Sequence, residues 1–533
     1  MKSKLLKAAD VSGFTFLMPV IRFAYGDERQ KQIGEMGRMI LVPLLAIGLF
    51  LAAWAVISPL VKTKSGELPG PAMTEQAAED IWSLHRQENA KEASYYSDPA
   101  DAEAKLKQTQ ARLAELKTAH AKVDALVASE SAKSDAILAE RLDPFKAKVA
   151  AFRTGTKADA KQREAKLAAY GRSLAADDRA GRQKLLAMTR AHLAKVDLDR
   201  ETLRDLDAKV AETSRFQTDA LKDALALQTE IAEEKQFLEA VEGLLVRNRQ
   251  AQIDASVARL NERKVAYLAA TGDDVAAQAV KVVKAQDRVV TMQDASFPKT
   301  FTLPMQVLRS ILCVFVGFLL GVAVAIPIGV LCGLSPTFMS AMTPFIALFK
   351  PVSPIVWILI ALIVVGGVLP DPDKNPVILA LAELPLIGWM KINPAFIASA
   401  ITVALCSLWP TMTNTALGVA SISDDHMNVA RVLKLGFGER LLKIVIPSAL
   451  PLIFAGMRIS LGVGWMVLIA AELLSTSEGI GKFVADQWQN GASDSFAKMI
   501  VVVFVVGAIG LLLDRIMVVF QRAVSFDGAP AAV

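Results

Sequence analysis

The chain has 533 residues, of which 53% are hydrophobic and 21% charged, and its formal net charge is +5. A net charge this small for the length gives no reason to expect a nucleic-acid partner. All three cysteines lie within apolar runs, so no disulfide framework is implied. The apolar residues are unevenly distributed, which indicates a membrane protein with one large polar domain inserted into it.

The first apolar run, Met39–Val61, has the length of a membrane-spanning helix, which needs about 20 apolar residues. It begins too far into the chain, and is too long, to be the apolar core of a cleaved signal peptide. Residues 1–38 contain seven Lys and Arg residues, which the positive-inside rule places in the cytoplasm. We therefore expect a bacterial inner-membrane protein with a cytoplasmic N-terminal segment and a periplasmic domain at residues 62–300.

The periplasmic domain is predicted to be helical, because Ala, Leu and Val recur at three-and-four spacing between charges. Helix breaks are expected near Pro144, at Gly155, around Gly171–Gly181 and at Thr271–Gly272. The chain has to return to the same membrane face, so the expected form is an antiparallel hairpin or coiled coil. Arms of about 60 residues would reach about 90 Å. The alanine-rich seam favours pairing with another copy or protein, although a self-contained spacer fits equally well.

Further apolar runs after residue 308 predict five more spans. Pro376–Met390 is apolar but short and contains Glu383, so we interpret it as a re-entrant or interfacial segment on the outer side. Six spans place both chain ends in the cytoplasm, with residues 524–533 as a tail. The expected fold is all-α, a polytopic membrane protein with a long helical insertion. The five spans are Arg309–Gly333, Met342–Leu369, Pro394–Gly418, Ile453–Leu473 and Ile500–Phe520.

A polar, helix-prone segment lies between two apolar runs at residues 420–447. Asp424 and Asp425 suit the start of a helix, where acidic groups cap it and interact well with its dipole. Val432 and Leu433 belong to an apolar face, and Gly436 with Gly438 is expected to end the helix.

This segment resembles the signature of ATP-binding-cassette importer permeases, which reads Glu-Ala-Ala, three residues, Gly, nine residues, Ile, one residue, Leu-Pro. The spacing is kept here. Asn428 replaces the Glu, Val429 the first Ala, Lys434 the Gly and Ile446 the Leu. The resemblance implies that the segment binds a cytoplasmic ATPase through Asp425, His426, Asn428, Val429, Ala430, Arg431, Leu433, Lys434 and Gly436.

The wider context resembles the nitrate/bicarbonate-type permeases, which belong with the nitrate, sulfonate, taurine and bicarbonate importers. The resemblance extends over residues 308–522 and leaves out the helical insertion. It implies a permease core at residues 301–523, present as two copies, with two ATPase subunits and an external substrate-binding protein. It implies no cofactor, metal or enzymatic activity of the chain itself. The matching motifs are Lys350–Pro354, Ser407–Pro410, Asn414–Val419, Gly456–Gly462, Ala470–Leu473 and Gly510–Asp514.

The substrate path is predicted from polar and ionisable groups in or near the spans, which are costly unless they are paired or line a path. A cation in the path would suit an oxyanion. For Lys350 and Arg458 the structural alternative is favoured, in which they reach the inner membrane face or pair with Asp514. Tryptophans near a membrane interface are also commonly anchors. The candidate path residues are Lys350, Ser353, Trp357, Arg458, Trp465 and Glu472.

The sequence therefore predicts the permease subunit of an importer that moves a small anion, such as nitrate, bicarbonate or a sulfonate, by alternating access. A membrane-anchored tether with long periplasmic arms is the alternative, and it needs neither six spans nor a coupling segment. In a third possibility, the arms of an importer recruit or replace the binding protein. Gly479–Lys482 resembles the end of a phosphate-binding loop, but Thr476 and Phe483 replace its required Gly and Ser/Thr.

Overall fold

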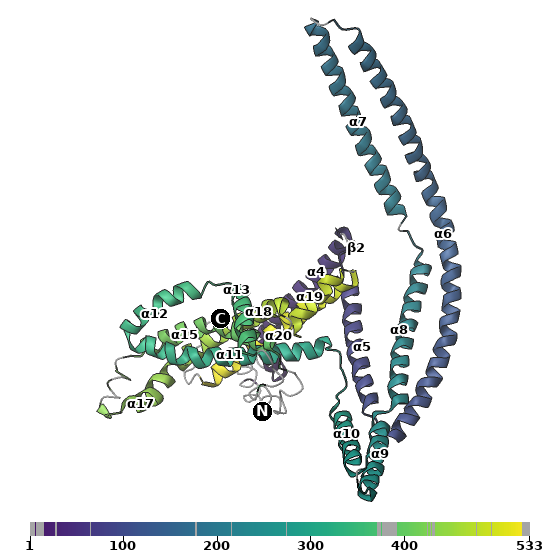
Figure 1. The fold of residues 1–533 in the computed structure, drawn as a ribbon. Helices are drawn as coiled ribbons and strands as arrows, with labels where there is room; N and C mark the ends of the chain where they lie inside the picture. Colours follow the sequence, from purple (N-terminus) through teal and green to yellow (C-terminus); the bar gives the residue numbers. More distant parts are fainter. Residues whose placement is uncertain are drawn as a thin grey trace. The chain divides into compact units, whose positions relative to one another are not determined.

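The computed structural model contains two compact units, Met1–Glu88 with Lys299–Val533 and Asn89–Pro298, which we call the membrane unit and the arm unit (Figure 1). The all-α fold predicted from the sequence is confirmed. The structure describes residues 6, 15–26, 29–63, 66–175, 178–214, 216–272, 274–369, 375, 392–423, 425–426, 428, 432–475, 477–491 and 493–524.

The membrane unit begins with short helical segments that lead into the first span. Arg29–Leu60 is long and apolar enough to cross a membrane, and none of its most apolar window is buried against the rest of the unit. This exposure suits a helix that faces lipid on most sides. The elements here are η1 (Thr15–Leu17), α2 (Met18–Ala24), α3 (Arg29–Met36), η2 (Gly37–Leu41), α4 (Val42–Ile57), η3 (Ser58–Leu60), β1 (Lys62–Thr63), β2 (Gly66–Glu67) and α5 (Pro71–Tyr95).

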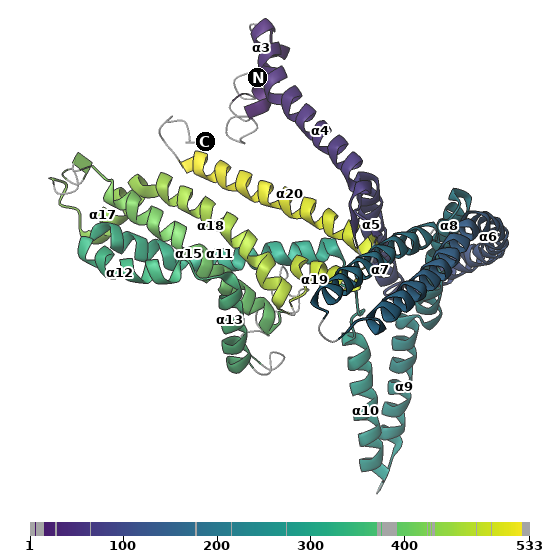
Figure 2. The same cartoon turned by 90° about the horizontal axis from the view of Figure 1, so that it is seen from above.

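The centre of the membrane unit is formed by α11, α15 and α18, which pack along one another (Figure 2). Among the described residues, five helices could cross a membrane, or six if one bent pair counts as a span. Ala77 and Ile81 of α5 join the main core cluster, so the start of α5 is fastened to this centre. The remaining helices are α11 (Leu303–Leu334), α12 (Pro336–Phe349), α13 (Pro354–Val368), α15 (Pro394–Ala420), α17 (Phe437–Arg440), η6 (Leu441–Val445), α18 (Ile446–Leu474), α19 (Ile480–Asn490) and α20 (Ser493–Val524).

Glycines on α11 allow its backbone to approach that of α15. A Cβ atom built on Gly317 would lie 2.5 Å from the Ala400 carbonyl oxygen, and one on Gly329 would lie 2.7 Å from the Met412 carbonyl oxygen. Gly321 and Gly333 face the same helix. The small-xxx-small spacing therefore serves close helix packing within the unit.

The predicted span Met342–Leu369 is bent and not one continuous helix. Its place is taken by α12 and α13, whose axes differ by 96°. The break falls at Lys350–Ser353, where Pro351 and Pro354 lack the N–H groups that a continuous helix needs. Figure 2 shows α13 leaving the α11–α15 pair at a steep angle. The predicted re-entrant segment Pro376–Met390 lies outside the described residues.

The arm unit consists of long antiparallel helices (Figure 1). Helix α6 packs against α8 along its first half and against α7 along its second half. Its 74 residues make it about 110 Å long. Both ends of the unit meet at the start of α6, because the Phe297 N–H donates to the Tyr96 hydroxyl over 3.0 Å. After the end of α5, the helices are α6 (Pro99–Arg172), α7 (Arg179–Thr213), α8 (Asp219–Arg247), α9 (Arg249–Ala269) and α10 (Asp274–Asp294).

Two of the predicted helix breaks are confirmed, and two are wrong. The chain turns between α6 and α7 and again between α9 and α10, as expected. Helix α6 instead continues through Pro144 and Gly155. Leu142 and Val149 are buried on either side of Pro144, so contacts with the partner helices hold α6 together where local propensity favours a break.

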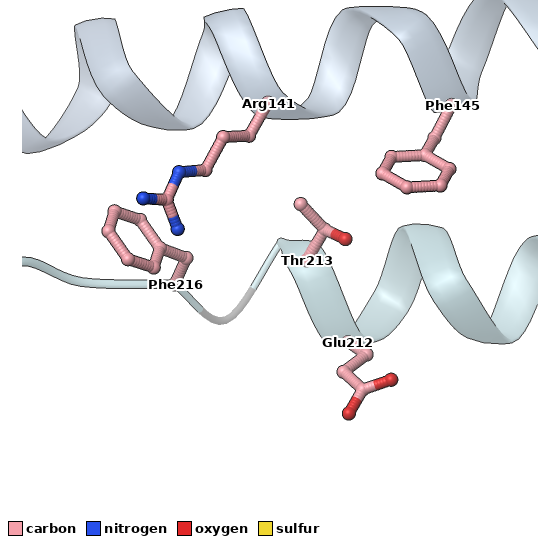
Figure 3. A pocket seen from close by; sticks show the side chains of 5 residues that line it. All are labelled: Arg141, Phe145, Glu212, Thr213 and Phe216. Atoms are coloured by element: carbon pink, nitrogen blue, oxygen red, sulfur yellow. The ribbon is translucent and has the colours of Figure 1, made fainter.

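A break that the sequence did not predict separates α7 from α8. Figure 3 shows the Arg141 guanidinium of α6 facing the Phe216 ring of the connecting segment, and its central carbon lies 4.0 Å from the ring centroid. Next to this contact, the Thr218 N–H donates to the Ser134 hydroxyl over 3.3 Å. A concavity of about 450 Å³ lies here, lined by Arg141, Phe145, Glu212, Thr213 and Phe216.

The two halves of the arm differ in packing. Between α6 and α8, apolar side chains such as Leu116, Val123 and Ile231 are buried together. Along α7, half-buried residues recur at coiled-coil spacing, but His192 is one of them. Its side chain is 10% exposed, and its Nε2 lies 3.8 Å from Glu164 Oε1, so a polar ring occupies a position where apolar side chains would pack better.

The close approach of α11 and α15 predicts a steric effect at Gly329. We expect Gly329→Val to destabilise the membrane unit by about 1–3 kcal/mol, because the added side chain would force the two backbones apart. Thermal unfolding of the purified protein in detergent measures this. Gly462→Val is the matched control, since nothing lies within 4 Å of a Cβ built there. Equal stability of the two variants would contradict the packing argument.

Candidate coupling and translocation sites

The candidate coupling segment joins α15 to α17 and is polar and exposed in its described part. Asp425, Asn428, Val432 and Leu433 line a shallow concavity of about 410 Å³. Val432 is 81% exposed and Leu433 is 62% exposed, which is costly for two apolar side chains in water. His426, Lys434 and Gly436 are also exposed. Val429, Ala430 and Arg431 lie outside the described residues.

The turn of this segment lies at Lys434, two residues before the predicted helix end at Gly436. Lys434 has a φ of 52°, in the left-handed region that favours glycine. Gly436 has a φ of −64° and instead precedes α17. Lys434 stands where the permease signature has its glycine. A glycine suits this position because its backbone is left-handed, and the lysine adopts the same backbone at a conformational cost.

Lys350 and Ser353 flank the break between α12 and α13. The exposed Lys350 shares a concavity of about 570 Å³ with Thr343 and Pro351, and with Thr413 of α15. The Ser353 hydroxyl caps α13 by accepting a hydrogen bond from the Ile355 N–H over 3.4 Å. The start of a helix and a lysine therefore lie close together at a break in an apolar region, an arrangement that suits an anion.

Three aromatic rings cluster beside this break. The Phe349 ring centroid lies 5.9 Å from that of Trp357 and 6.5 Å from that of Trp409. Both indole nitrogens, on Trp357 and Trp409, are buried and have no hydrogen-bond partner among the described residues. Buried N–H donors are ordinarily satisfied, so two unsatisfied ones in one cluster are available to a passing acceptor.

Arg458 of α18 pairs with Asp514 of α20 in the bidentate geometry that favours a structural ion pair. Its Nε donates to Asp514 Oδ1 over 2.6 Å, and its Nη2 donates to Oδ2 over 3.1 Å. This is the pair considered in the sequence analysis. With both carboxylate oxygens engaged, Arg458 links two membrane helices.

Trp465 lies inside the helix packing. Its side chain is 4% exposed, and its indole N–H donates to the Val506 carbonyl of α20 over 3.1 Å. Gly510 leaves room for the ring, with a Cβ built there 3.4 Å from it. These contacts describe a core residue between α18 and α20.

Glu472 is completely buried and fastens α19 to the core. The Ser310 hydroxyl of α11 lies 2.8 Å from the carboxylate, and the Gly481 N–H donates to it over 3.1 Å. The Ile480 N–H in turn donates to the Ser310 hydroxyl over 3.0 Å. A Cβ on Gly479 would collide with the Glu472 carboxylate. The glycines of Gly479–Lys482 therefore allow close approach to a glutamate.

Sequence reasoning missed a second buried polar group, Arg309 at the start of α11. It is 1% exposed, and its Nη2 donates to Asn393 Oδ1 over 3.2 Å. Asn393 also caps α15 by accepting a hydrogen bond from the Phe396 N–H over 2.8 Å. An arginine inside an apolar run was the available signal, because such a residue is costly unless it is paired.

Outside the membrane-spanning helices, His85 of α5 connects to the approach to α11. Its Nδ1 lies 2.7 Å from the Thr302 hydroxyl. Burial lowers the pKa of His85 below its ordinary value, and the nearby Lys299 cation lowers it further. The imidazole is therefore mainly neutral near pH 7, which suits a bond with a neutral hydroxyl.

Comparison with known families matches residues 325–526 to the model described as binding-protein-dependent transport system inner membrane component. The matched range includes the α12–α13 break, the coupling segment, the Arg458–Asp514 pair, and Glu472 with Gly481. Known proteins similar to this chain bear names of one kind, permease proteins of transport systems.

The nitrate import permease protein NrtB of Synechococcus elongatus is 34% identical over 223 residues, which are 42% of this chain and 70% of that protein. The bicarbonate transport system permease protein CmpB of the same species is 34% identical over 219 residues, 41% of this chain and 68% of that protein. The putative aliphatic sulfonates transport permease protein SsuC of Bacillus subtilis is 28% identical over 207 residues, 39% and 64% of the two chains.

The left-handed backbone at Lys434 predicts a residue preference. We expect Lys434→Gly to be tolerated, and Lys434→Val to cost about 1–2 kcal/mol because a β-branched residue clashes in this region. Hydrogen exchange of the amides around residues 432–440 measures the difference, with faster exchange in the Val variant. Indistinguishable exchange in the two variants would show that the turn does not hold this conformation in solution.

Proposed function

Since this chain belongs to the family of binding-protein-dependent transport system inner membrane components, we propose that it moves a small anion inward. The family consists of membrane permease subunits of ATP-binding-cassette importers, which are not enzymes themselves and work with an ATPase and a substrate-binding protein. Nitrate, bicarbonate and sulfonates are named for the similar proteins. They share a small size and negative charge, which is the substrate class we assign here.

The exposed apolar pair Val432 and Leu433 carries the proposal for this chain's own coupling site. The two side chains border the concavity on a segment that joins α15 and α18, and nothing in the described residues covers them. An ATPase surface that covered them would remove apolar area from water and grip a segment continuous with two core helices. Asp425, His426, Asn428, Lys434 and Gly436 would form its polar border, with Val429, Ala430 and Arg431 between them.

The proposed topology has both chain ends in the cytoplasm. Residues 1–38 precede the first span at 39–61, residues 62–300 lie in the periplasm, and residues 301–523 form the permease core. This assignment places the coupling segment at 420–447 and the tail at 524–533 on the cytoplasmic side, where Arg440 and Lys443 obey the positive-inside rule. Helix α19 then faces the periplasm, the side on which a binding protein arrives.

We assign the anion path to the break between α12 and α13. Lys350 supplies a positive charge, Ser353 marks the start of α13, and the Trp357 and Trp409 indoles supply unsatisfied N–H donors. The remaining candidates have structural partners: Arg458 binds Asp514, Trp465 binds the Val506 carbonyl, and Glu472 binds Ser310 and Gly481. We therefore give these three residues structural roles.

A second copy of the chain is proposed to cover the free face of α13. Ile355, Leu359 and Ile363 recur every four residues along this face, and they are 50%, 51% and 76% exposed. The spacing places them in one stripe. A two-fold partner would bring two such stripes together and enclose an anion path between the copies.

A tether remains the second candidate function, and the length of α6 favours it specifically. A helix of about 110 Å exceeds anything that a permease core requires. The two functions are compatible, because the arm unit and the membrane unit are separate compact parts of one chain. Co-purification from gently solubilised membranes separates them: a stoichiometric ATPase supports the importer, and envelope proteins without an ATPase support the tether alone.

A charge on the apolar surface of the coupling segment should prevent ATPase docking. We expect Leu433→Glu to reduce ATPase co-purification and anion uptake by tenfold or more, about the effect of losing 1.4 kcal/mol of binding. Leu268→Glu, at an 81% exposed leucine of the arm unit, is the matched control. Full ATPase recovery with Leu433→Glu would show that docking does not use this surface.

The assigned path predicts a role for the Lys350 charge. Lys350→Gln should raise the KM for anion uptake by roughly tenfold, while Lys350→Arg should retain most of the uptake because the positive charge remains. Co-purification with the ATPase is measured alongside and should be unchanged. Equal uptake by the Gln variant and the unmodified protein would exclude Lys350 from the path, without bearing on ATPase coupling.

A further inference from the structure

Charge is strongly segregated along the arm unit. Residues 141–190 contain 13 Lys and Arg against five Asp and Glu, a net charge of +8. Residues 101–140 and 191–247 together contain 14 Lys and Arg against 20 Asp and Glu, a net charge of −6. One stretch of the arm is therefore more positive than the entire chain. We call residues 141–190 the basic end.

The basic end lies opposite the points where the chain enters and leaves the arm unit. It comprises the second half of α6, the turn, and the beginning of α7 (Figure 1). The entry and exit meet at Tyr96 and Phe297, beside the start of α6. The far end of α6 is about 110 Å away along its axis, so the positive charge is concentrated at the end with the greatest reach.

The positive side chains of the basic end are accessible. All of its Lys and Arg residues are exposed except Arg163, which contacts Asp199 of α7. Arg153 pairs with Asp207. In contrast, Lys157, Lys161 and Lys166 form no ion pair with any described residue, so their charge is available to an external anion.

Leucines accompany the arginines on one face of α7. Arg182, Leu186, Arg190 and Leu193 are spaced by four, four and three residues, which places them in one stripe. All four are exposed, with Leu186 at 60% and Leu193 at 55%. Alternating cations and leucines match the headgroup boundary of a bilayer, where phosphates meet acyl chains.

Other occupants fit this surface less well. A second copy aligned with the first would bring two segments of +8 together, and like charges repel. An acidic polypeptide would satisfy the cations but would leave the leucines beside polar groups. A surface with both negative headgroups and an apolar layer satisfies both kinds of residue.

We propose that the basic end of the arm docks on a membrane surface rich in anionic phospholipid. Lys157, Lys161 and Lys166 contribute attraction to the headgroups, and Leu186 with Leu193 enters the interface. This interaction does not depend on the proposed transport function, since it uses residues of the arm unit alone. It gives the long arm a ligand at the end opposite its chain entry and exit.

Vesicle flotation with the full-length chain tests the proposal. The chain is placed in nanodiscs of phosphatidylcholine and mixed with vesicles of phosphatidylcholine, with or without about 30% phosphatidylglycerol. We expect binding only to the anionic vesicles and weaker binding at raised salt. The variant K157Q/K161Q/K166Q should lose about tenfold or more of the binding, because each cation near the surface contributes separately.

Two further variants make the test decisive. K105Q/K117Q/K122Q removes three exposed lysines from the first half of α6, outside the basic end, and should bind like the unmodified chain. L186Q/L193Q should weaken vesicle binding while keeping the helix, since glutamine is a good helix former. The proposal is overturned if both lysine variants behave alike, or if the leucine variant binds normally. Binding to immobilised poly-glutamate without vesicle binding would overturn it in favour of an acidic polypeptide.

Discussion

The close contact between α11 and α15 is the constraint on which the membrane unit depends. A membrane offers no hydrophobic driving force between helices, so stability comes from backbone proximity, dispersion and a few buried polar bonds. The glycines of α11 supply the proximity, and α18 completes the core by packing against both α15 and α11. With these three helices fixed, the chain can bend by 96° between α12 and α13 without loss of the fold.

Buried and half-buried polar groups then secure the periphery of this core. Glu472 and Ser310 hold the start of α19, Arg309 reaches the cap of α15, and Arg458 with Asp514 joins α18 to α20. Each network joins elements that are distant in the chain. Because an unpaired charge in this setting is so costly, each pairing favours one arrangement of the helices over its alternatives.

The sequence was sufficient for most of the helices and for the family, because both depend on local signals. Apolar runs of bilayer length and the spaced motifs at 350–354 and 428–447 can be recognised from the sequence alone. The partners of Glu472 were not, since Ser310 is far from it in the chain and the bond exists only after packing. The predictions of a helix break at Pro144 and of a helix end after Lys434 were wrong for a related reason. Local propensity favours a helix break at Pro144, but contacts with the partner helices outweigh it. Local propensity favours glycine at position 434, but the chain tolerates the conformational cost of a lysine there.

The joint between α7 and α8 has a mechanical consequence for the arm. Over most of its length the arm is two helices thick, and a paired rod resists bending far better than a single helix. At the joint only α6 is continuous, while its partner passes through the short segment held by Phe216 and Thr218. A sideways load on the arm therefore concentrates its curvature at the level of Arg141. The arm therefore consists of two stiff segments joined at this level, and the contact between Arg141 and Phe216 opposes bending between them.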